Sequence, residues 1–454
     1  MKHMKPSELY PVLNRGDYAD LFMEDSSFTT IKWEDGKIEE LNTGTDTGCG
    51  LRYCCGDSVY FGTADSLALN VITDVSHRIG IGLPEQRNRP PVKPVISVSQ
   101  PARINPDTVP IDKKIKLIEQ VYRHIKSSGS EIAQIIIYYG ERSKQTGIVT
   151  SEGAAVAEGR KYIITMISVV ATKNNLLQTA TEVYGGIGGY EIMDESKIMA
   201  LGRAVAARAC KKLYAPSAPV GEMPVIIAAQ AGGTMIHEAI GHSLEADAVQ
   251  KGISPVYVGK KGSMVASDLI TVIDDPTLEG KRGSYHFDDE AVKSKPTILI
   301  ENGELKNYLY DIRTAHKDSV DSNAHGRRQS YKERPIPRMS NTFIQPGNDD
   351  PRRIIGSIDQ GLLVCKMGGG QVNTATGDFI FDVEEGYRIK DGSVHELVRG
   401  ANLLGNGPDV LRSIDRVGND IGWGIGTCGK DGQGVPVADA QPTIRIKKML
   451  VGGS

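Results

Sequence analysis

Two prolines directly after a long helical pattern constrain the fold of this chain more than any other feature. Asp194 precedes that pattern, which carries apolar residues along one face. Pro216 and Pro219 follow in the segment Ala-Pro-Ser-Ala-Pro-Val-Gly, which is typical of a boundary between domains. Because 454 residues exceed what one compact core usually holds, we predict two domains, residues 1–215 and residues 216–454.

The first predicted domain combines helices with strands. Residues 112–128 repeat apolar side chains at helical spacing, and Gly129 follows as a stop signal. Apolar runs at 135–139, 162–170 and 177–184 predict strands, and the last two are joined by a short turn. A short turn makes such a pair antiparallel. We therefore expect an N-terminal α/β domain.

The second predicted domain is rich in strands and glycine. Residues 223–229 predict a strand, and a helix is expected to begin at Gly233 or Thr234. From about Ser263 onward, short apolar runs alternate with glycine-rich turns, which favours an antiparallel, barrel-like or sandwich domain. The predicted class is α+β, with a mainly antiparallel C-terminal domain that carries the candidate site helix.

Composition excludes several classes of function. The formal net charge is −3 and no long basic block occurs, which argues against a nucleic-acid partner. The first residues lack the apolar core of a signal peptide, and the longest apolar runs are far too short to span a bilayer. The six cysteines form no C-x-x-C pair, which suits a reducing compartment. We expect a cytoplasmic protein without a membrane partner.

The most informative motif is H-E-x-x-x-H, formed by His237, Glu238 and His242. The familiar zinc-peptidase pattern has one fewer residue between the glutamate and the second histidine. On a regular helix, residues five apart point about 140° from each other, so the two imidazoles would diverge. One wide turn with an i→i+5 hydrogen bond would bring them together. Gly241 is consistent with such a distortion, or with a helix that ends there.

A catalytic zinc site usually has three protein ligands and an open position, so two histidines do not complete it. The candidate third ligands are His286, His325, Glu245, Asp247 and Cys428. Cys428 lies among glycines that leave its sulfur uncrowded, and a thiolate is a metal ligand. The residues alone leave simpler alternatives open: a core histidine at His237, a solvated helix charge at Glu238 and an inert buried thiol at Cys428.

The order of several short motifs carries a family resemblance over nearly the whole chain. They read G-T-D-T-G-C-G-L-R from Gly44, G-S-Y-H-F-D-D-E from Gly283, P-R-M-S-N-T from Pro337, G-G-G-Q-V from Gly368 and G-T-C-G-K-D-G-Q from Gly426. With the H-E-x-x-x-H motif, the chain resembles the TldD/PmbA family, once called modulators of DNA gyrase. It is similar to the TldD side, which carries the metal motif, rather than to the PmbA (TldE) side, which lacks it.

The resemblance implies a metallopeptidase whose divalent metal, expected to be zinc, is held by His237, His242 and Cys428. It also implies an N-terminal α/β domain and a β-rich C-terminal domain. Dimers are implied, either of this chain with itself or with a PmbA/TldE-like paralogue, around an internal site for unfolded or small peptides. One departure from the family pattern is the segment 438–440, where more glycine is expected.

The resulting hypothesis is that Glu238 accepts a proton from the attacking water and delivers it to the leaving amine. His325, Tyr331 and Arg338 lie in polar segments that could face the cleft and bind substrate or stabilise an oxyanion. Each could equally be a satisfied surface or interface residue. Two rival functions remain: a non-catalytic regulatory subunit of a heterodimeric protease, and a metal-dependent amidohydrolase that acts on non-peptide substrates.

Overall fold

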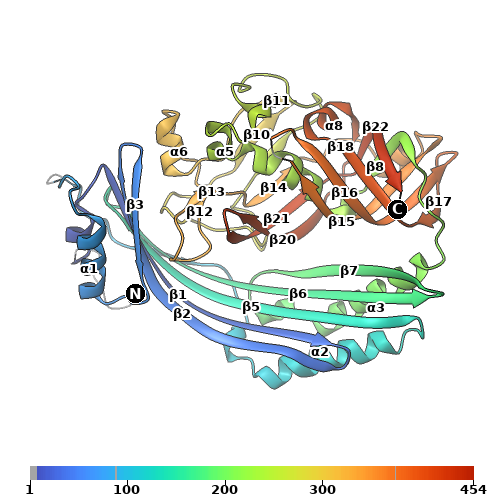
Figure 1. Cartoon of the computed structure of the whole chain (residues 1–454), viewed down its shortest axis with the longest axis horizontal. Helices are drawn as coiled ribbons and strands as arrows, with labels where there is room; N and C mark the ends of the chain where they lie inside the picture. The colour runs from blue at the N-terminus through green and yellow to red at the C-terminus, as the bar shows by residue number, and fades with distance from the viewer. Residues whose placement is uncertain (1–7, 87–88, 374, 454) are drawn as a thin grey trace.

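The structure is a computed structural model that describes residues 8–86, 89–373 and 375–453. A long curved sheet from the N-terminal half forms the base, and the strand-rich C-terminal half lies against its concave face (Figure 1). Helices cover the opposite face of the sheet. The fold is mixed α+β and consists mainly of strands, as the sequence predicts.

The N-terminal sheet has the strand order β3-β2-β1-β5-β6-β4, and β7 pairs with β6. All of these pairs are antiparallel except that of β4 with β6. The strands are β1 (Tyr18–Glu34), β2 (Lys37–Cys55), β3 (Ser58–Ala64), β4 (Ile96–Ser99), β5 (Ile132–Thr150), β6 (Ala155–Lys173) and β7 (Leu176–Ile187). Two tight turns set the register: Asp35–Gly36 joins β1 to β2, and Asn174–Asn175 joins β6 to β7. All four residues have positive φ, which type I′ hairpin turns require at both central positions.

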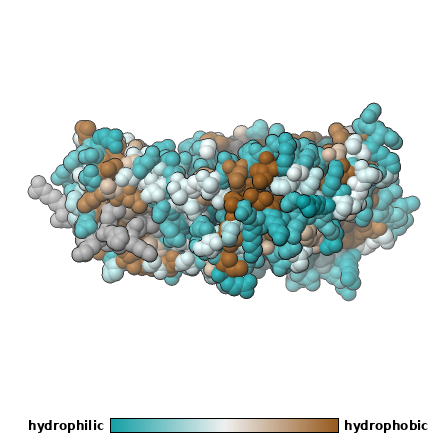
Figure 2. All heavy atoms as spheres, turned by 90° about the horizontal axis from the view of Figure 1, so that it is seen from below, coloured by the Kyte–Doolittle hydropathy of each residue, from teal (hydrophilic) through white to brown (hydrophobic). Residues whose placement is uncertain are grey.

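Three helices cover the convex face of this sheet and its end: α1 (Leu69–Ile79), α2 (Ile111–Lys126) and α3 (Glu195–Lys212). The predicted helices at 112–128 and after Asp194 are confirmed as α2 and α3, and the Asp194 carboxylate caps α3 by accepting the Lys197 N–H. The apolar stripes of both helices bury against β5 and β6 in one hydrophobic cluster. Seen from the helix side, the surface is mainly hydrophilic, with hydrophobic side chains gathered near its middle (Figure 2).

The C-terminal half contains a closed ring of five strands. Its order is β15-β8-β22-β18-β16, and β16 pairs back with β15. The ring strands are β8 (Gly221–Ile227), β15 (Gln360–Val372), β16 (Asp378–Lys390), β18 (Ala401–Asn406) and β22 (Ile444–Gly453), with β17 (Ser393–Val398), β19 (Ile414–Val417) and helix α8 (Gly407–Ser413) attached. This closed barrel is the barrel-like domain that the sequence predicts.

A second sheet of the C-terminal half carries part of the candidate site. Its order is β11-β10-β9-β14-β21-β20, and only β14 with β21 is parallel among its pairs. Its strands are β9 (Val272–Asp274), β10 (Thr297–Glu301), β11 (Glu304–Leu305), β14 (Asn341–Ile344), β20 (Gly422–Lys430) and β21 (Gln433–Gln441). The small elements nearby are β12 (Gly326–Arg327), β13 (Ile336–Pro337), α5 (Ala246–Gln250), α6 (Ile312–Lys317) and α7 (Pro351–Ile355). The predicted division of the chain at residue 215 stays a prediction.

Buried ion pairs join the N-terminal sheet to the C-terminal half. Arg52 on β2 binds Asp20 and Glu290, and its side chain is only 2% exposed. Glu158 on β6 pairs with Arg160 and also accepts the backbone N–H groups of His286 and Phe287. Burial alone would raise the pKa of Glu158, but Arg160 and these donors lower it to about 2. The carboxylate therefore stays ionised at the contact between the two halves.

Within the described ranges, no helix is both long and apolar enough to cross a lipid bilayer. The cytoplasmic location stays a prediction.

The Glu158 contact generates a prediction about stability. The substitution Glu158→Gln should lower the free energy of unfolding by about 3 kcal/mol near neutral pH, because it removes the carboxylate from a buried ion pair. The folded-state pKa of about 2 lies below the ordinary value of about 4.3, so this stabilisation is present above that ordinary value and is lost as the pH falls toward 2. Urea unfolding at neutral and acidic pH measures the difference.

The control for this prediction is Glu119→Gln, which removes an exposed pair with Arg123 on α2. It should change the free energy of unfolding by less than about 0.5 kcal/mol at either pH. Equal losses in the two variants would contradict the assignment of Glu158 to a stabilising contact between the two halves.

Candidate metal centre

The motif segment is a short helix with one wide turn. α4 (Thr234–Ile236) leads into a π-helical turn over His237–Gly241, and a 3-10 turn follows over His242–Leu244. The His242 N–H donates to the His237 carbonyl, and of the two alternatives that Gly241 allows, the wide turn with an i→i+5 bond is the one observed. The two imidazole rings consequently lie 5.2 Å apart between centroids, at 88° to each other. The helix then ends, because Glu245 has an extended backbone.

Packing explains the glycine in this turn. A Cβ atom added to Gly241 would lie 1.9 Å from the sulfur of Met339, a fully buried side chain. Only a residue without a side chain leaves room for Met339 beneath the wide turn. Gly241 is thus required by close approach, in addition to being a weak helix former.

Cys428 approaches the helix from the edge strand β20. Its Sγ lies 3.3 Å from Nε2 of His242, and one ligand atom from each of His237, His242 and Cys428 lies within 4.8 Å of the others. Among the described residues, this is the one group of three or more His, Cys, Asp or Glu side chains close enough to hold a metal ion. The structure therefore brings together the three residues that the sequence singles out as ligands.

Glu245 fixes the orientation of His242. Its carboxylate lies 3.1 Å from Nδ1 of His242 and 3.1 Å from Nζ of Lys430. Burial would raise the pKa of Glu245, but Lys430 and His242 lower it to about 2, so the carboxylate is ionised. An ionised carboxylate accepts the proton on Nδ1, so Nε2, the nitrogen on the Cys428 side, is the one that would bind a metal. This is the tautomer that a metal ligand needs.

Asp439 on β21 lies beside the other histidine. Its Oδ2 is 3.9 Å from Nδ1 of His237, and its Oδ1 accepts the Gly233 N–H at the start of the helix. Burial raises the pKa of Asp439, His237 opposes this rise, and the charge of Glu238 adds to it. Asp439 is not among the residues that the sequence singles out, because segment 438–440 stands out there only as a departure from the family pattern. Apolar residues occupy both faces of β21, so no alternation of apolar and polar side chains marks Asp439 in the sequence.

The residues present fit a metal ion. Nδ1 of His237 is buried and has no hydrogen-bond partner among the described residues, which is unusual for a buried polar atom. Burial would raise the pKa of Cys428, but hydrogen bonds and the charges of the two histidines lower it to about 5. A thiolate with two imidazoles is a donor set that suits zinc.

Three sequence models of the PmbA/TldA metallopeptidases match this chain: domain 1 at residues 19–75, the central domain at 104–213 and the C-terminal domain at 220–453. The chain belongs to the PmbA/TldD family.

Curated relatives of this family match over almost their whole length. The chain is 34% identical to the metalloprotease TldD homologue of Haemophilus influenzae, over 96% of this chain and 93% of that protein. It is 33% identical to a metalloprotease of Methanothermobacter thermautotrophicus, over 99% and 98%. It is 26% identical to a protein of Saccharolobus solfataricus named zinc metalloprotease TldD homologue, over 94% and 97%.

Solved structures show the same fold. A protein of Thermotoga maritima, described as a candidate modulator of a DNA gyrase, superposes with a TM-score of 0.80 at 17% identity and covers 96% of both chains. TldE from Thermococcus kodakarensis superposes with a TM-score of 0.74 at 17% identity, over 96% of this chain and 97% of that chain.

Two other candidate residues of this PmbA/TldD chain, His325 and Tyr331, make polar contacts outside the cluster of the three candidate ligands. His325 is fully buried and binds Asp274 and Asn323 through its two ring nitrogens. The hydroxyl of Tyr331 donates to Asp46 and Asp65 of the N-terminal half.

Arg338 lies closer to the candidate ligands. Its guanidinium donates to the carbonyl of Cys428 and to that of Gln433, on the two strands of the β20–β21 hairpin. The predicted part of His325, Tyr331 and Arg338 in substrate binding stays a prediction.

The two remaining candidate ligands lie outside the cluster in this PmbA/TldD chain. His286 contacts Glu158 on β6, and its side chain is 45% exposed. Asp247 binds Lys430, the same ammonium group that binds Glu245. Asp247 is thus connected to the cluster through Lys430 and Glu245.

The wide turn generates a prediction. Gly241→Ala should destabilise the protein by about 1–3 kcal/mol and reduce the metal that the purified protein retains, because the new Cβ forces the turn away from Met339. Thermal unfolding and elemental analysis after dialysis measure the two effects. Gly429→Ala is the matched control, since its Cβ would meet nothing within 4 Å. A Gly241→Ala variant as stable and metal-rich as the Gly429→Ala variant would contradict the prediction.

Proposed function

We propose that this chain is a metal-dependent peptidase that hydrolyses unfolded or small peptides. The observation that carries the proposal is the convergence of His237, His242 and Cys428 beside Glu238 on the wide turn. The curated relatives are named metalloproteases, and these names support metal-dependent peptide hydrolysis.

The proposed ligands are His237, His242 and Cys428, and the proposed metal is zinc. A metal held by three protein groups keeps a position open, where it would acidify a water and polarise a scissile carbonyl. The name of the Saccharolobus solfataricus relative supports zinc. Glu245, together with Lys430, orients His242, as the partners of metal ligands commonly do, and Asp439 holds the start of the helix that carries His237.

Glu238 is the proposed general base. It follows His237 directly on the turn, its charge acts on Asp439 beside that histidine, and it is half-buried, so solvent still reaches it. Glu238 takes a proton as the water oxygen bonds to the carbonyl carbon of the substrate. The carbon–nitrogen bond then breaks, and Glu238 delivers that proton to the departing amine nitrogen. Protons and electrons balance, with water and peptide consumed and a carboxylic acid and an amine formed.

Arg338 is proposed as a residue that positions the ligand strand. Its guanidinium is fully buried and donates to the carbonyls of Cys428 and Gln433. Through these two hydrogen bonds it fixes the position of the β20–β21 hairpin, which carries Cys428. The assembly proposed for the active enzyme is a dimer of this chain with itself or with a PmbA/TldE-like paralogue. This chain shares its fold with TldE, which supports a dimer of two chains that are folded alike.

Two rival functions make different predictions. A non-catalytic regulatory subunit has no use for Glu238 next to the ligand cluster. A metal-dependent amidohydrolase would use the same residues on a non-peptide amide. Incubation with a disordered polypeptide and with a panel of small amides separates the three, since the peptidase cleaves the polypeptide, the amidohydrolase cleaves the amides and the regulatory subunit cleaves neither.

Glu238→Gln should reduce peptide hydrolysis by at least about 100-fold, because the amide cannot accept the proton of the water. The metal content should stay that of the wild type, since Glu238 is not a proposed ligand. Cleavage of a disordered polypeptide and elemental analysis of the same sample measure both quantities. Retained activity at normal metal content would remove Glu238 from the mechanism.

Cys428→Ala should strip the protein of most of its metal, because it deletes one of three proposed ligands and leaves a site of two imidazoles. Elemental analysis of the dialysed protein gives the metal-to-chain ratio. Cys365→Ala is the matched control, since Cys365 is also buried but lies on β15 outside the ligand cluster. Equal metal contents in the two variants would exclude Cys428 as a ligand.

A further inference from the structure

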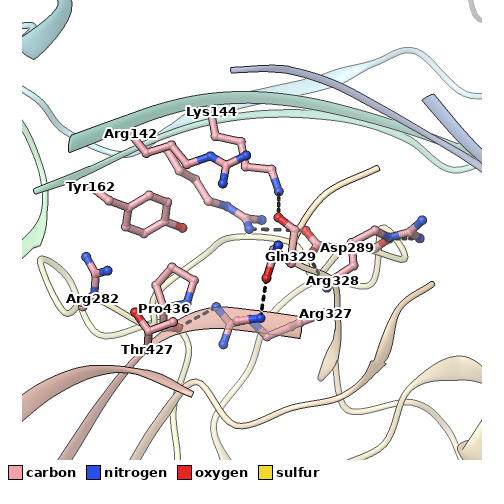
Figure 3. Close-up of a pocket in the computed structure, with 12 residues that line it drawn as sticks. Arg142, Lys144, Tyr162, Arg282, Asp289, Arg327, Arg328, Gln329, Thr427 and Pro436 are labelled. Carbon is pink, nitrogen blue, oxygen red and sulfur yellow. Dashed lines mark hydrogen bonds and ion pairs between the residues drawn. The ribbon is translucent and has the colours of Figure 1, made fainter. Parts of the chain in front are cut away.

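A polar cavity, distinct from the candidate metal centre, lies between the N-terminal sheet and the β20–β21 hairpin. Its volume is about 160 Å³. β5 and β6 form one wall, and residues of β20 and β21 form part of the facing wall (Figure 3). Its charged lining residues are Arg142, Lys144, Arg160, Arg282, Arg327, Arg328 and Asp289. Six cations thus face one carboxylate around a space that holds several water molecules or one small solute.

Four of the six cations have carboxylate partners. Glu24 is shared by Arg142 and Lys144. Arg160 pairs with Glu158 and Asp289, and Arg328 pairs with Asp20. The three cations of the β5 and β6 wall are therefore all paired with carboxylates. Arg328 shares its partner, Asp20, with Arg52.

The other two cations, Arg282 and Arg327, have no carboxylate partner in the ranges that the structure describes. Arg282 is 6% exposed; its Nε donates to the Gly426 carbonyl, and its Nη1 is buried without a partner. Arg327 is 3% exposed and donates to the carbonyls of Met339 and Pro436. Burial lowers the pKa of Arg282, as expected for a cation without a counterion.

An unpaired buried guanidinium is costly, because desolvation of the charge is not repaid by an anion. An anion bound between Arg282 and Arg327 would compensate both charges, which explains why two such guanidiniums line one cavity. The flat fork of N–H donors on arginine matches the two oxygens of a carboxylate or of a phosphate. The Arg142 side chain is 36% exposed, so an anion can approach past the rim of the cavity.

We propose that this cavity is a binding site for a small oxyanion, of carboxylate or phosphate chemistry, held by Arg282 and Arg327 between the N-terminal sheet and the β20–β21 hairpin. The site is separate from the metal centre. Thr427 lines the cavity, whereas the neighbouring Cys428 points to His242, because successive side chains of a strand face opposite ways. The oxyanion comes either free from solution or as the carboxylate of a bound peptide.

The first test compares thermal unfolding in inorganic phosphate with unfolding in sodium chloride of equal ionic strength. Phosphate should raise the unfolding midpoint of the wild type by about 2 °C or more beyond chloride, since a ligand of the folded state stabilises it. In Arg282→Gln this extra rise should disappear. The midpoint of the variant without phosphate should be no lower than that of the wild type, because an unpaired buried charge is gone.

Arg388→Gln is the matched control, since Arg388 lies on β16 and is 42% exposed in a pair with Glu396. It should keep the full phosphate response. If Arg282→Gln does not fold, Arg282→Lys takes its place; it keeps the charge but loses the fork and should show a smaller response. The absence of any extra rise in the wild type, or an undiminished rise in the Arg282 variant, overturns the proposal.

A second arm separates the two sources of the oxyanion. A short alanine peptide with a free C-terminal carboxylate is compared with the same peptide as its C-terminal amide, in the Glu238→Gln background so that neither is cleaved. A larger midpoint rise with the free acid, lost on adding Arg282→Gln, identifies a peptide carboxylate as the occupant. If phosphate raises the midpoint but the free acid and the amide act alike, the occupant is a free oxyanion. No response to either overturns the site.

Discussion

A single hydrogen bond of unusual span, from the His242 N–H to the His237 carbonyl, is the constraint on which the candidate centre depends. A regular helix would turn the two imidazoles about 140° apart. The wide turn removes this divergence, and the surrounding contacts are arranged to keep it. Met339 fills the space beneath Gly241, Asp439 holds the start of the helix, and the chain becomes extended at Glu245, whose carboxylate orients the second histidine.

Charge, rather than apolar contact alone, joins the two halves of the molecule. The carboxylates of Asp20, Glu24 and Glu158 lie on the N-terminal sheet, and each is shared by more than one donor. The C-terminal half contributes both cations and carboxylates to this layer, and its cations exceed the carboxylates at the cavity of Arg282 and Arg327. A buried layer of this kind is strong only where each charge has a partner, so the cavity of Arg282 and Arg327 is where an external anion is expected.

Much of the fold can be predicted from the sequence, because the relevant signals are local. Apolar residues at helical spacing locate α2, and the Asn174–Asn175 turn joins β6 to β7 as expected. The wide turn can also be predicted, since the extra residue between Glu238 and His242 requires it if both histidines bind one ion. Asp439 and Arg282 could not be predicted in the same way. Their importance arises from strand pairing and burial over long sequence separations, which residue spacing does not encode.

Strand β20 contributes residues to both of the proposed sites. Cys428 faces the helix and lies next to His242, while Thr427 lines the cavity on the other side of the strand. Arg338 and Arg282 each donate to a carbonyl of this strand, at Cys428 and at Gly426. The position of the Cys428 sulfur and the arrangement of the cations are therefore linked through two nearby peptide groups of the same strand. An anion that draws Arg282 into the cavity would act on the backbone that carries the proposed metal ligand.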